Sequence, residues 1–325
     1  MWLSVVSPAL FVAALWTTTP DKVEAERVWE SARESLLEIE SRSAGRGYAI
    51  LIDRTGLFLV SSSLVDQAQV WGRTPQGTLV SLDVVSTDEV TQFALLLGRS
   101  MDQQLARMKP VRLAAQPDEG WLLAGLPSGV LRGEWVGSNR VGLMKPNSRY
   151  LPLTEMRFET PSIRFGGAPV FNSNGELVAI VSATLEPVAT KKESMNKAQY
   201  GPTGLTVAYS LGPRVIQRVV DGFRSPSRLP KHPTIGAFFG EGKQPGALVV
   251  DVTKGSPSDD AGLRTGDLIV AINEIAVEDR FDLVRALFDQ VVGEVVELKV
   301  RRLGQEALLN LKITIGDQRD LATRR

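Results

Sequence analysis

Few side chains in this sequence could support nucleophilic or acid–base chemistry. The chain contains no cysteine and a single histidine, His232. The absence of cysteine excludes disulfides, a thiol nucleophile and thiolate metal sites, and one imidazole excludes a His-rich zinc site. A serine hydroxyl becomes a useful nucleophile only beside a hydrogen-bonded base. Because His232 lies in the proline-rich sequence SPSRLPKHP, we predict a solvated linker histidine without a catalytic role, and no metal or other cofactor.

Length and charge bound the class of protein. A chain of 325 residues corresponds to roughly two domains. The 43% of apolar residues is enough for packed cores. Lys plus Arg and Asp plus Glu both number 37, which gives zero formal net charge, and no long basic block is present. Nucleic acid is therefore not expected as a partner.

The stretch IRFGGAPVFNSNGELVAI, residues 163–180, has the pattern of a glycine turn, a strand, a hairpin turn and a second strand. It resembles the nucleophile loop of trypsin-like serine proteases of the HtrA (Deg) family, G-N-S-G-G-P-L-V-N-x-x-G-E. Alignment on the proline, asparagine, glycine and glutamate of that pattern places the nucleophilic serine on Gly166. The resemblance thus implies a protease framework in which the reactive hydroxyl is missing.

Two more segments extend the resemblance. GRGYAILIDRTGLFLVSSSLV (45–65) follows the family pattern around the catalytic histidine, which falls on Ser63. VVSTDEVTQFALL (84–96) follows the pattern around the catalytic aspartate, which falls on Gln92. In the family, a glycine two residues before the nucleophile donates to the oxyanion hole, and that position is Arg164. The resemblance therefore implies an inactive member with all three triad positions replaced, in which peptidase activity is not expected.

Two alternatives stay open. The first is an active HtrA-type endopeptidase in which Ser63 or Ser162 is the nucleophile and a lysine is the base, although Lys191 and Lys192 lie in a polar stretch where lysines are usually solvated. The second is a structural subunit of a membrane-associated assembly, with no peptide-binding role.

The elements around these positions are mostly short strands. From about residue 45 short β-type runs alternate with Gly, Pro and Asp turns, which favours an all-β sandwich or barrel. Helices are predicted at 21–38, with Trp29 on the apolar face, and at 213–223 after Pro213. The predicted strands are 48–52, 57–60, 78–85, 93–97, 121–126, 134–137, 176–185 and 205–211.

The last segment has another order of elements, with strands at 234–240, 246–252 and 266–273, two helices, and two closing strands. GALVVDVTKGSPSDDAGLRTGDLIVAIN (246–273) closely resembles a PDZ domain in the HtrA arrangement. The resemblance implies a loop whose backbone amides bind a C-terminal carboxylate, and a side-chain pocket beside it. For the pocket positions on the helix, ordinary core packing is the alternative. The implied peptide-binding residues are Thr234, Ile235, Gly236, Ala237, Val284 and Leu287.

The expected fold is mainly β, a trypsin-like double β-barrel followed by one PDZ domain. Residues 1–20 carry no charged side chain and suggest a signal-like or membrane-anchor segment, hence an exported, periplasmic or membrane-tethered protein, with a buried start of the chain as the alternative. The expected boundaries are 21–222 for an inactive protease-fold domain, 223–232 for a linker, 233–316 for the PDZ domain and 317–325 for a tail.

The expected function is that of an HtrA-like pseudoprotease that binds polypeptide C-termini or unfolded segments. Such a protein would act as an adaptor or regulator in protein quality control, with an active protease as one partner. HtrA relatives commonly form trimers through their protease domains, so a homotrimer is also expected from the resemblance. The predicted helix at 21–38 is a candidate contact surface, and packing within the chain is its alternative.

Overall fold

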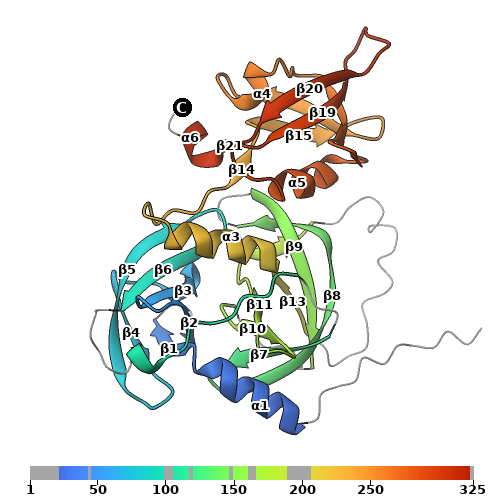
Figure 1. The fold of residues 1–325 in the computed structure, drawn as a ribbon. Helices are drawn as coiled ribbons and strands as arrows, with labels where there is room; N and C mark the ends of the chain where they lie inside the picture. The colour runs from blue at the N-terminus through green and yellow to red at the C-terminus, as the bar shows by residue number, and fades with distance from the viewer. Residues whose placement is uncertain are drawn as a thin grey trace, which may run out of the picture.

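The computed structural model describes residues 22–42, 45–98, 105–116, 120–145, 149–159, 166–188 and 206–322. These residues form two lobes, a larger one with two β-sheets and a smaller one that contains the C-terminal third of the chain (Figure 1). None of the helices in these ranges is both long and apolar enough to cross a membrane. The segment 1–20 and the positions Ser162, Arg164, Lys191 and Lys192 lie outside the described residues.

The first sheet is a closed barrel with the strand order β1-β2-β3-β6-β5-β4. Pairing of Glu38 with Arg73 and of Ile39 with Gly72 joins β1 to β4 and completes the barrel. Leu51, Phe58 and Leu82 belong to the apolar cluster inside it. Its strands are β1 (Leu36–Ser41), β2 (Gly45–Asp53), β3 (Leu57–Ser61), β4 (Gln69–Arg73), β5 (Leu79–Asp88) and β6 (Phe93–Gly98).

The second sheet has the order β11-β10-β7-β8-β9-β13, and β12 pairs with β8. A bridge between Val181 and Ser210 links the segments at its two ends. The prediction of a mainly β, trypsin-like double-barrel fold is confirmed. The strands are β7 (Trp121–Leu126), β8 (Gly129–Met144), β9 (Arg149–Phe158), β10 (Pro169–Asn172), β11 (Leu177–Ile180), β12 (Leu185–Pro187) and β13 (Thr206–Ser210).

The hairpin predicted from the asparagine- and glycine-containing turn joins β10 to β11. The Asn172 side-chain oxygen accepts hydrogen bonds from the backbone amides of Asn174 at 3.1 Å and Glu176 at 2.9 Å. Gly175 has φ +71°, a conformation that favours glycine. Next to Gly166, the Gly167 amide donates to the backbone oxygen of Val181 at 2.7 Å, which holds the segment before β10 beside the end of β11.

In the described part of the larger lobe, two helices and two short 3-10 turns accompany the barrels: α1 (Lys22–Arg33), α3 (Pro213–Arg224), η1 (Ser62–Leu64) and η2 (Leu105–Arg107). The helix predicted at 213–223 is confirmed as α3, whose apolar residues are buried. The helix predicted at 21–38 ends early, at Arg33, because LLEIES is largely buried and pairs with β2 as β1. Residues 36–41 therefore form a strand, although their apolar spacing would also allow the helix to continue.

The smaller lobe is built on the sheet β15-β16-β17-β19-β20. The strand predicted at 234–240 is in fact divided, because Gly236 has φ +74° and turns the chain between β14 and β15. The segment expected as a tail contains the end of β21, which pairs with β14, and a short helix. The elements are β14 (Pro233–Thr234), β15 (Ala237–Glu241), β16 (Ala247–Val252), α4 (Pro257–Asp260), β17 (Leu268–Ile272), β18 (Ile275–Ala276), α5 (Arg280–Phe288), β19 (Val295–Arg301), β20 (Leu309–Thr314), β21 (Gly316–Asp317) and α6 (Gln318–Ala322).

His232 lies in the seam between the two lobes, and the prediction that it is solvated was wrong. Its side chain is 1% exposed, and Nε2 lies 2.9 Å from both carboxylate oxygens of Asp88 at the end of β5. A second contact crosses the same seam: Arg218 of α3 donates to the backbone oxygen of Phe288 at 2.6 Å, and its guanidinium lies over that ring. The His232–Asp88 contact thus holds the proline-rich segment against the first barrel, and the local sequence gives no sign of this contact.

Candidate functional site

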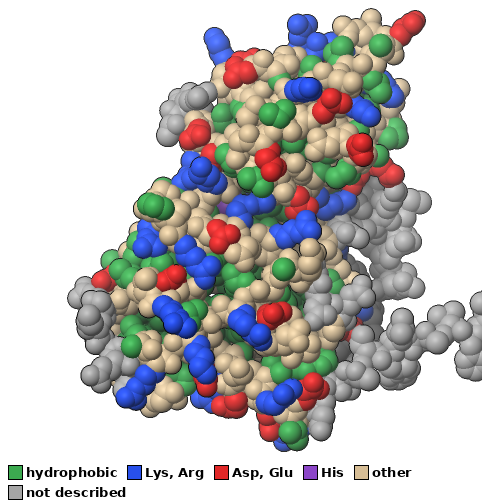
Figure 2. Space-filling model, viewed as in Figure 1, with side chains coloured by type: hydrophobic (Ala, Val, Ile, Leu, Met, Phe, Trp, Pro, Cys, Tyr) green, Lys and Arg blue, Asp and Glu red, His purple; other side chains and the backbone are tan. Residues whose placement is uncertain are grey.

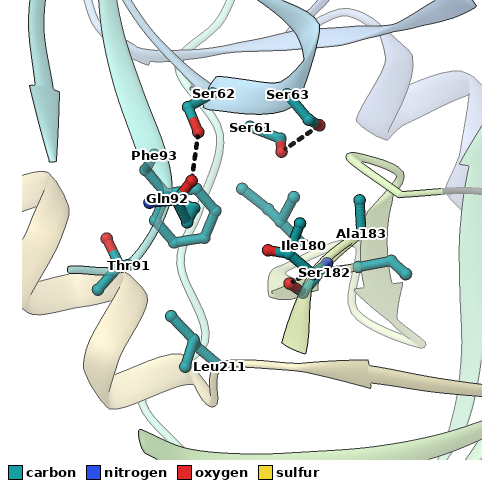
Figure 3. A pocket seen from close by; sticks show the side chains of 12 residues that line it. Ser61, Ser62, Ser63, Thr91, Gln92, Phe93, Ile180, Ser182, Ala183 and Leu211 are labelled. Carbon is teal, nitrogen blue, oxygen red and sulfur yellow. Dashed lines mark hydrogen bonds between the residues drawn. The ribbon is translucent and has the colours of Figure 1, made fainter. Parts of the chain in front are cut away.

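The positions aligned with the catalytic base and acid lie together at one small cavity of the larger lobe. Ser61–Ser63, Thr91–Phe93, Ile180–Thr184 and Leu211 line it (Figure 3). Its volume is about 20 Å³, enough for about one water molecule. The structure therefore brings Ser63 and Gln92 to the same site, as their alignment requires.

The side chains at this cavity include hydroxyls and one amide. Ser63 Oγ lies 2.9 Å from Ser61 Oγ, and Ser62 Oγ donates to Gln92 Oε1 at 3.3 Å (Figure 3). Gln92 Nε2 donates to the backbone oxygen of Glu89 at 2.7 Å, so both ends of the amide are engaged. Neither a hydroxyl nor an amide accepts a proton usefully near neutral pH. The side chains of Ser63 and Gln92 thus supply no base.

Gly166, at the nucleophile position, packs against Ala183, which lines the same cavity. A Cβ atom added at Gly166 would lie 2.5 Å from the Ala183 Cβ and 2.9 Å from its Cα. Real Cβ atoms essentially never make non-bonded contacts this short, and neither neighbour is the end of a flexible side chain. The space for a nucleophile side chain is therefore closed. Arg164, at the altered oxyanion position, lies outside the described residues.

The imidazole of His232 is directed at a carboxylate and not at a hydroxyl. Asp88, its partner, is buried and also accepts from the Thr91 hydroxyl and from the Val90 amide. The other ring nitrogen, Nδ1, is buried and has no hydrogen-bond partner within the described residues. A catalytic histidine must contact both its orienting acid and its nucleophile. Among the described residues, His232 makes only the first of these two contacts.

A larger groove, with a volume of about 420 Å³, lies in the smaller lobe between β15 and α5. Of the six residues predicted to bind peptide, five line it: Thr234, Ile235, Ala237, Val284 and Leu287. Gly236 is not among the lining residues but forms the adjoining turn, where its amide donates to Thr234 Oγ1 at 3.2 Å.

The core-packing alternative for the helix positions is partly correct. Leu287 is 7% exposed and belongs to the apolar core of the smaller lobe, whereas Val284 is only partly buried. Both side chains also line the groove. Leu287 therefore serves the core and the groove together, and Val284 is the more accessible probe of the groove.

The far wall of this groove comes from the larger lobe, which the sequence reasoning missed. Arg149, Tyr150 and Leu151 of β9 line it beside Arg280 and Phe281 of α5. The rings of Tyr150 and Phe281 meet edge to face with their centroids 5.5 Å apart, and the Arg280 guanidinium lies 5.3 Å from the Tyr150 ring centroid. No local sequence signal indicates such a contact, because the two segments are more than a hundred residues apart.

Comparison with known proteins agrees with both lobes. The family model of the PDZ domain matches residues 233–313. A probable periplasmic serine endoprotease DegP-like from Rhizobium meliloti is 30% identical over 45% of this chain and 29% of its own length. The protein of the same description from Marinomonas sp. is 24% identical over 84% of this chain and 58% of its own length. A putative serine protease HhoA from Synechocystis sp. is 26% identical over 81% of this chain and 69% of its own length.

Among solved structures, the HtrA-type protease AlgW with decapeptide superposes with a TM-score of 0.63 at 16% identity and covers 90% of this chain and 98% of its own. A serine endoprotease from Yersinia pestis superposes with a TM-score of 0.59 at 17% identity and covers 92% of this chain and 98% of its own. At these identities the likeness shows the fold alone.

Taken together, the fold defines a trypsin-like protease domain joined to one PDZ domain. In sequence and in architecture the chain is similar to proteases of the HtrA/DegP type, and its residues 233–313 match the PDZ domain family. The chain spans less than two thirds of the length of the first two relatives described above.

Proposed function

We propose that this protein binds extended or C-terminal peptides in the groove between β15 and α5. The observation that carries the proposal is the convergence of Thr234, Ile235, Ala237, Val284 and Leu287 on one groove of about 420 Å³. Most other lining residues are apolar, including Phe238, Phe239 and Val250. An apolar groove of this size with a few polar groups is a typical ligand site.

The edge of the sheet supplies the backbone part of the interaction. β15 is the end strand of its sheet and pairs with β16 on one side only, within the residues that the structure describes. An extended peptide can add to such an edge as a further strand, with main-chain hydrogen bonds for affinity and side-chain pockets for specificity. The Gly236 turn stands at the beginning of β15, where a terminal carboxylate would meet backbone amides.

We further propose that the barrel cleft does not cleave the bound chain. The proposal is supported by the residue types at Ser63, Gln92 and Gly166, by the contact that closes the nucleophile position, and by the engagement of His232 with Asp88. Triad catalysis needs a nucleophile, a base and an orienting group in mutual contact. The alternative is an endopeptidase that uses Ser63 or Ser162, and the names of the relatives, which are serine endoproteases, are its support.

We also propose a cellular compartment, from the similarity to these relatives. Relatives are described as periplasmic, so we place this protein outside the cytoplasm, as an exported or membrane-tethered component of protein quality control. A homotrimer, or a complex with an active protease, is a further proposal that follows from the family resemblance.

Peptide binding is tested by fluorescence anisotropy of a labelled C-terminal peptide library with the full chain. Val284→Glu should weaken binding at least about tenfold, because it places a carboxylate in an apolar groove and near the carboxylate of the ligand. Val291→Glu is the matched control, since Val291 is 57% exposed and does not line the groove. Equal affinities for wild type and Val284→Glu would show that the peptide binds outside this groove. No binding at all would favour the function of a structural subunit.

Gly236→Trp is not a clean probe of the groove. A Cβ atom at Gly236 would lie 2.3 Å from the Ser256 Cβ, and its φ of +74° disfavours any side chain. This substitution should disturb the fold as well as the groove.

Catalytic silence is tested by fluorophosphonate labelling and by casein turnover beside an active relative. We expect neither labelling nor turnover. Labelling of one serine that disappears on its replacement by alanine, together with turnover, would establish the endopeptidase instead.

A further inference from the structure

The groove carries a charge that peptide binding in general does not explain. Among the described residues, its lining includes two arginines, Arg149 and Arg280, and no aspartate, glutamate or lysine. Figure 2 shows Lys and Arg side chains along the seam between the lobes on the face in view. One ligand carboxylate at the Gly236 turn would leave the Arg280 guanidinium, further along the groove, as a site for additional negative charge.

The position of Arg280 gives the groove a direction. Arg280 begins α5, and its Nε lies 3.5 Å from the Glu241 carboxylate at the end of β15. At the other end of α5, the Phe288 ring lies 6.3 Å from the ring of His232, which directly precedes β14 and the turn at Gly236. The carboxylate end and the arginine end of the groove are therefore separated by the length of the helix.

That length corresponds to a few residues of ligand. The helix α5 has 9 residues, so its first and last residues are about 12 Å apart at 1.5 Å per residue. An extended peptide advances about 3.3 Å per residue. A peptide with its terminal carboxylate at the turn would thus bring the side chain about three to four residues upstream close to Arg280.

The two lobes hold the guanidinium in place together. Arg280 lies 4.7 Å from the Phe281 ring centroid of its own helix and 5.3 Å from that of Tyr150 on β9. Arg149 precedes Tyr150 on the same strand and lines the same groove. Stacking on two rings restricts the long side chain, which lowers the entropy cost of binding a carboxylate. The Glu241 side chain is 42% exposed, and its carboxylate would compete with an acidic ligand for the Arg280 guanidinium.

We propose that this groove selects peptides with an acidic side chain about three to four residues before an apolar C-terminal residue. Arg280 of the PDZ lobe recognises that acid, and Arg149 of the barrel lobe adds positive charge to the lining of the same groove. The proposal depends on peptide binding in the groove and defines the class of ligand.

The experiment compares peptides that differ only at the third and fourth positions before a C-terminal valine, where they carry Glu, Gln or Lys. Anisotropy with the full chain should show the Glu peptide bound about three- to tenfold more tightly than the Gln peptide, with the Lys peptide weakest. The preference should shrink as ionic strength rises. Arg280→Gln should remove most of it, and Arg280→Lys should retain part of it.

Two further variants separate charge recognition from packing. Arg285→Gln, on the same helix but outside the groove lining, should leave the preference unchanged. Glu241→Gln should increase it, because the fixed competitor for Arg280 is removed. Equal affinity for all three peptides, or a uniform loss for all three in Arg280→Gln, would overturn acid selection while peptide binding stands. Absence of binding by every peptide would overturn both proposals.

Discussion

At the scale of single residues, Gly166 combines a chemical absence with a packing requirement. It has no hydroxyl, and a Cβ atom at this position would lie only 2.5 Å from the Ala183 Cβ, which leaves no room for one. Ser63 and Gln92 are different, because they line an existing cavity. Gln92 has φ +60°, a conformation that aspartate also tolerates better than most residues. The three triad positions would therefore respond unequally to replacement.

Gly166→Ser should destabilise the protein by about 1–3 kcal/mol, the usual cost of overpacking. Adding Ala183→Gly in the same chain should recover part of the loss, because it removes the nearest atom, the Ala183 Cβ at 2.5 Å, and leaves the Cα at 2.9 Å. Thermal unfolding of the single and double variants measures both effects. An unchanged transition temperature for Gly166→Ser alone would show that the loop moves freely out of the way.

Restoration of activity should follow the same logic. Ser63→His, Gln92→Asp and Gly166→Ser together rebuild the triad side chains but leave Ala183 in place and Arg164 at the oxyanion position. Since the loss of one oxyanion donor costs about 10²–10³ in rate, we expect measurable casein turnover only after Ala183→Gly and Arg164→Gly are added. Comparable turnover in the triple variant would mean that the oxyanion hole was already formed.

At the scale of elements, α1 is an internal support of the barrels. Trp29 lies edge to face with Tyr48 and Phe171, at centroid distances of 6.0 and 6.4 Å. Gly125 of β7 accommodates the indole, since a Cβ there would lie 2.4 Å from it. The apolar face of the helix is thus directed at its own domain, as the intramolecular alternative supposed. Whether the chain forms a trimer stays a prediction.

Trp29→Ala should cost about 2–4 kcal/mol of unfolding free energy, because it empties a site between two aromatic rings and a strand. Glu26→Ala, on the exposed side of the same helix, should change stability little. Chemical denaturation gives the free energies, and light scattering on the same samples gives the mass. A lower mass for Trp29→Ala, with an unchanged unfolding free energy, would assign this face to an interface between copies. A truncation near residue 40 is less informative, because it removes most of β1 from the barrel.

At the scale of the whole molecule, buried polar contacts join the two lobes. His232 bonds to Asp88 of the first barrel through its side chain, and its backbone amide donates to Asp317 at 3.4 Å. Arg319 also donates to Asp317, at 2.7 Å. Because β21 pairs with β14, the C-terminal end of the PDZ lobe is held beside the same histidine. The contacts of His232 with Asp88 and Asp317 therefore help to set the relative position of the lobes.

His232→Ala should lower stability by about 1.5–3 kcal/mol, since it deprives a buried carboxylate of one of its donors. It should also speed cleavage between the lobes in limited proteolysis, whereas Lys231→Ala, at an exposed neighbouring position, should not. Identical unfolding and cleavage in the two variants would show that the His232–Asp88 contact does not hold the lobes together.

Asp317 makes part of this seam sensitive to acid. Burial acts to raise the pKa of Asp317, but hydrogen bonds from the Arg319 side chain and backbone and from the His232 backbone outweigh it, so this pKa lies below its ordinary value. A depressed pKa stabilises the native state above the unfolded value of about 3.9, and the contribution is lost as pH falls through the native pKa.

Asp317→Asn should therefore lower the transition temperature near neutral pH. The difference from wild type should narrow below about pH 4 and vanish below the native pKa. Calorimetry across the acid range measures it. A difference that is constant with pH would assign the effect to shape and not to charge.

The domain types and the supply of reactive groups could be predicted from local sequence patterns. These patterns involve residues that are close in sequence, so they can be recognised without a structure. They are the strand periods, the turn glycines and the sequence from Gly246 to Asn273. Contacts between distant residues required the folded chain. His232 meets Asp88 across 144 positions, Ala183 closes the space beside Gly166, β1 replaces the end of a predicted helix, and β9 forms one wall of the groove beside α5. Burial and contact are properties of the packed chain, because they are set by which surfaces meet after folding and not by the residues next in sequence.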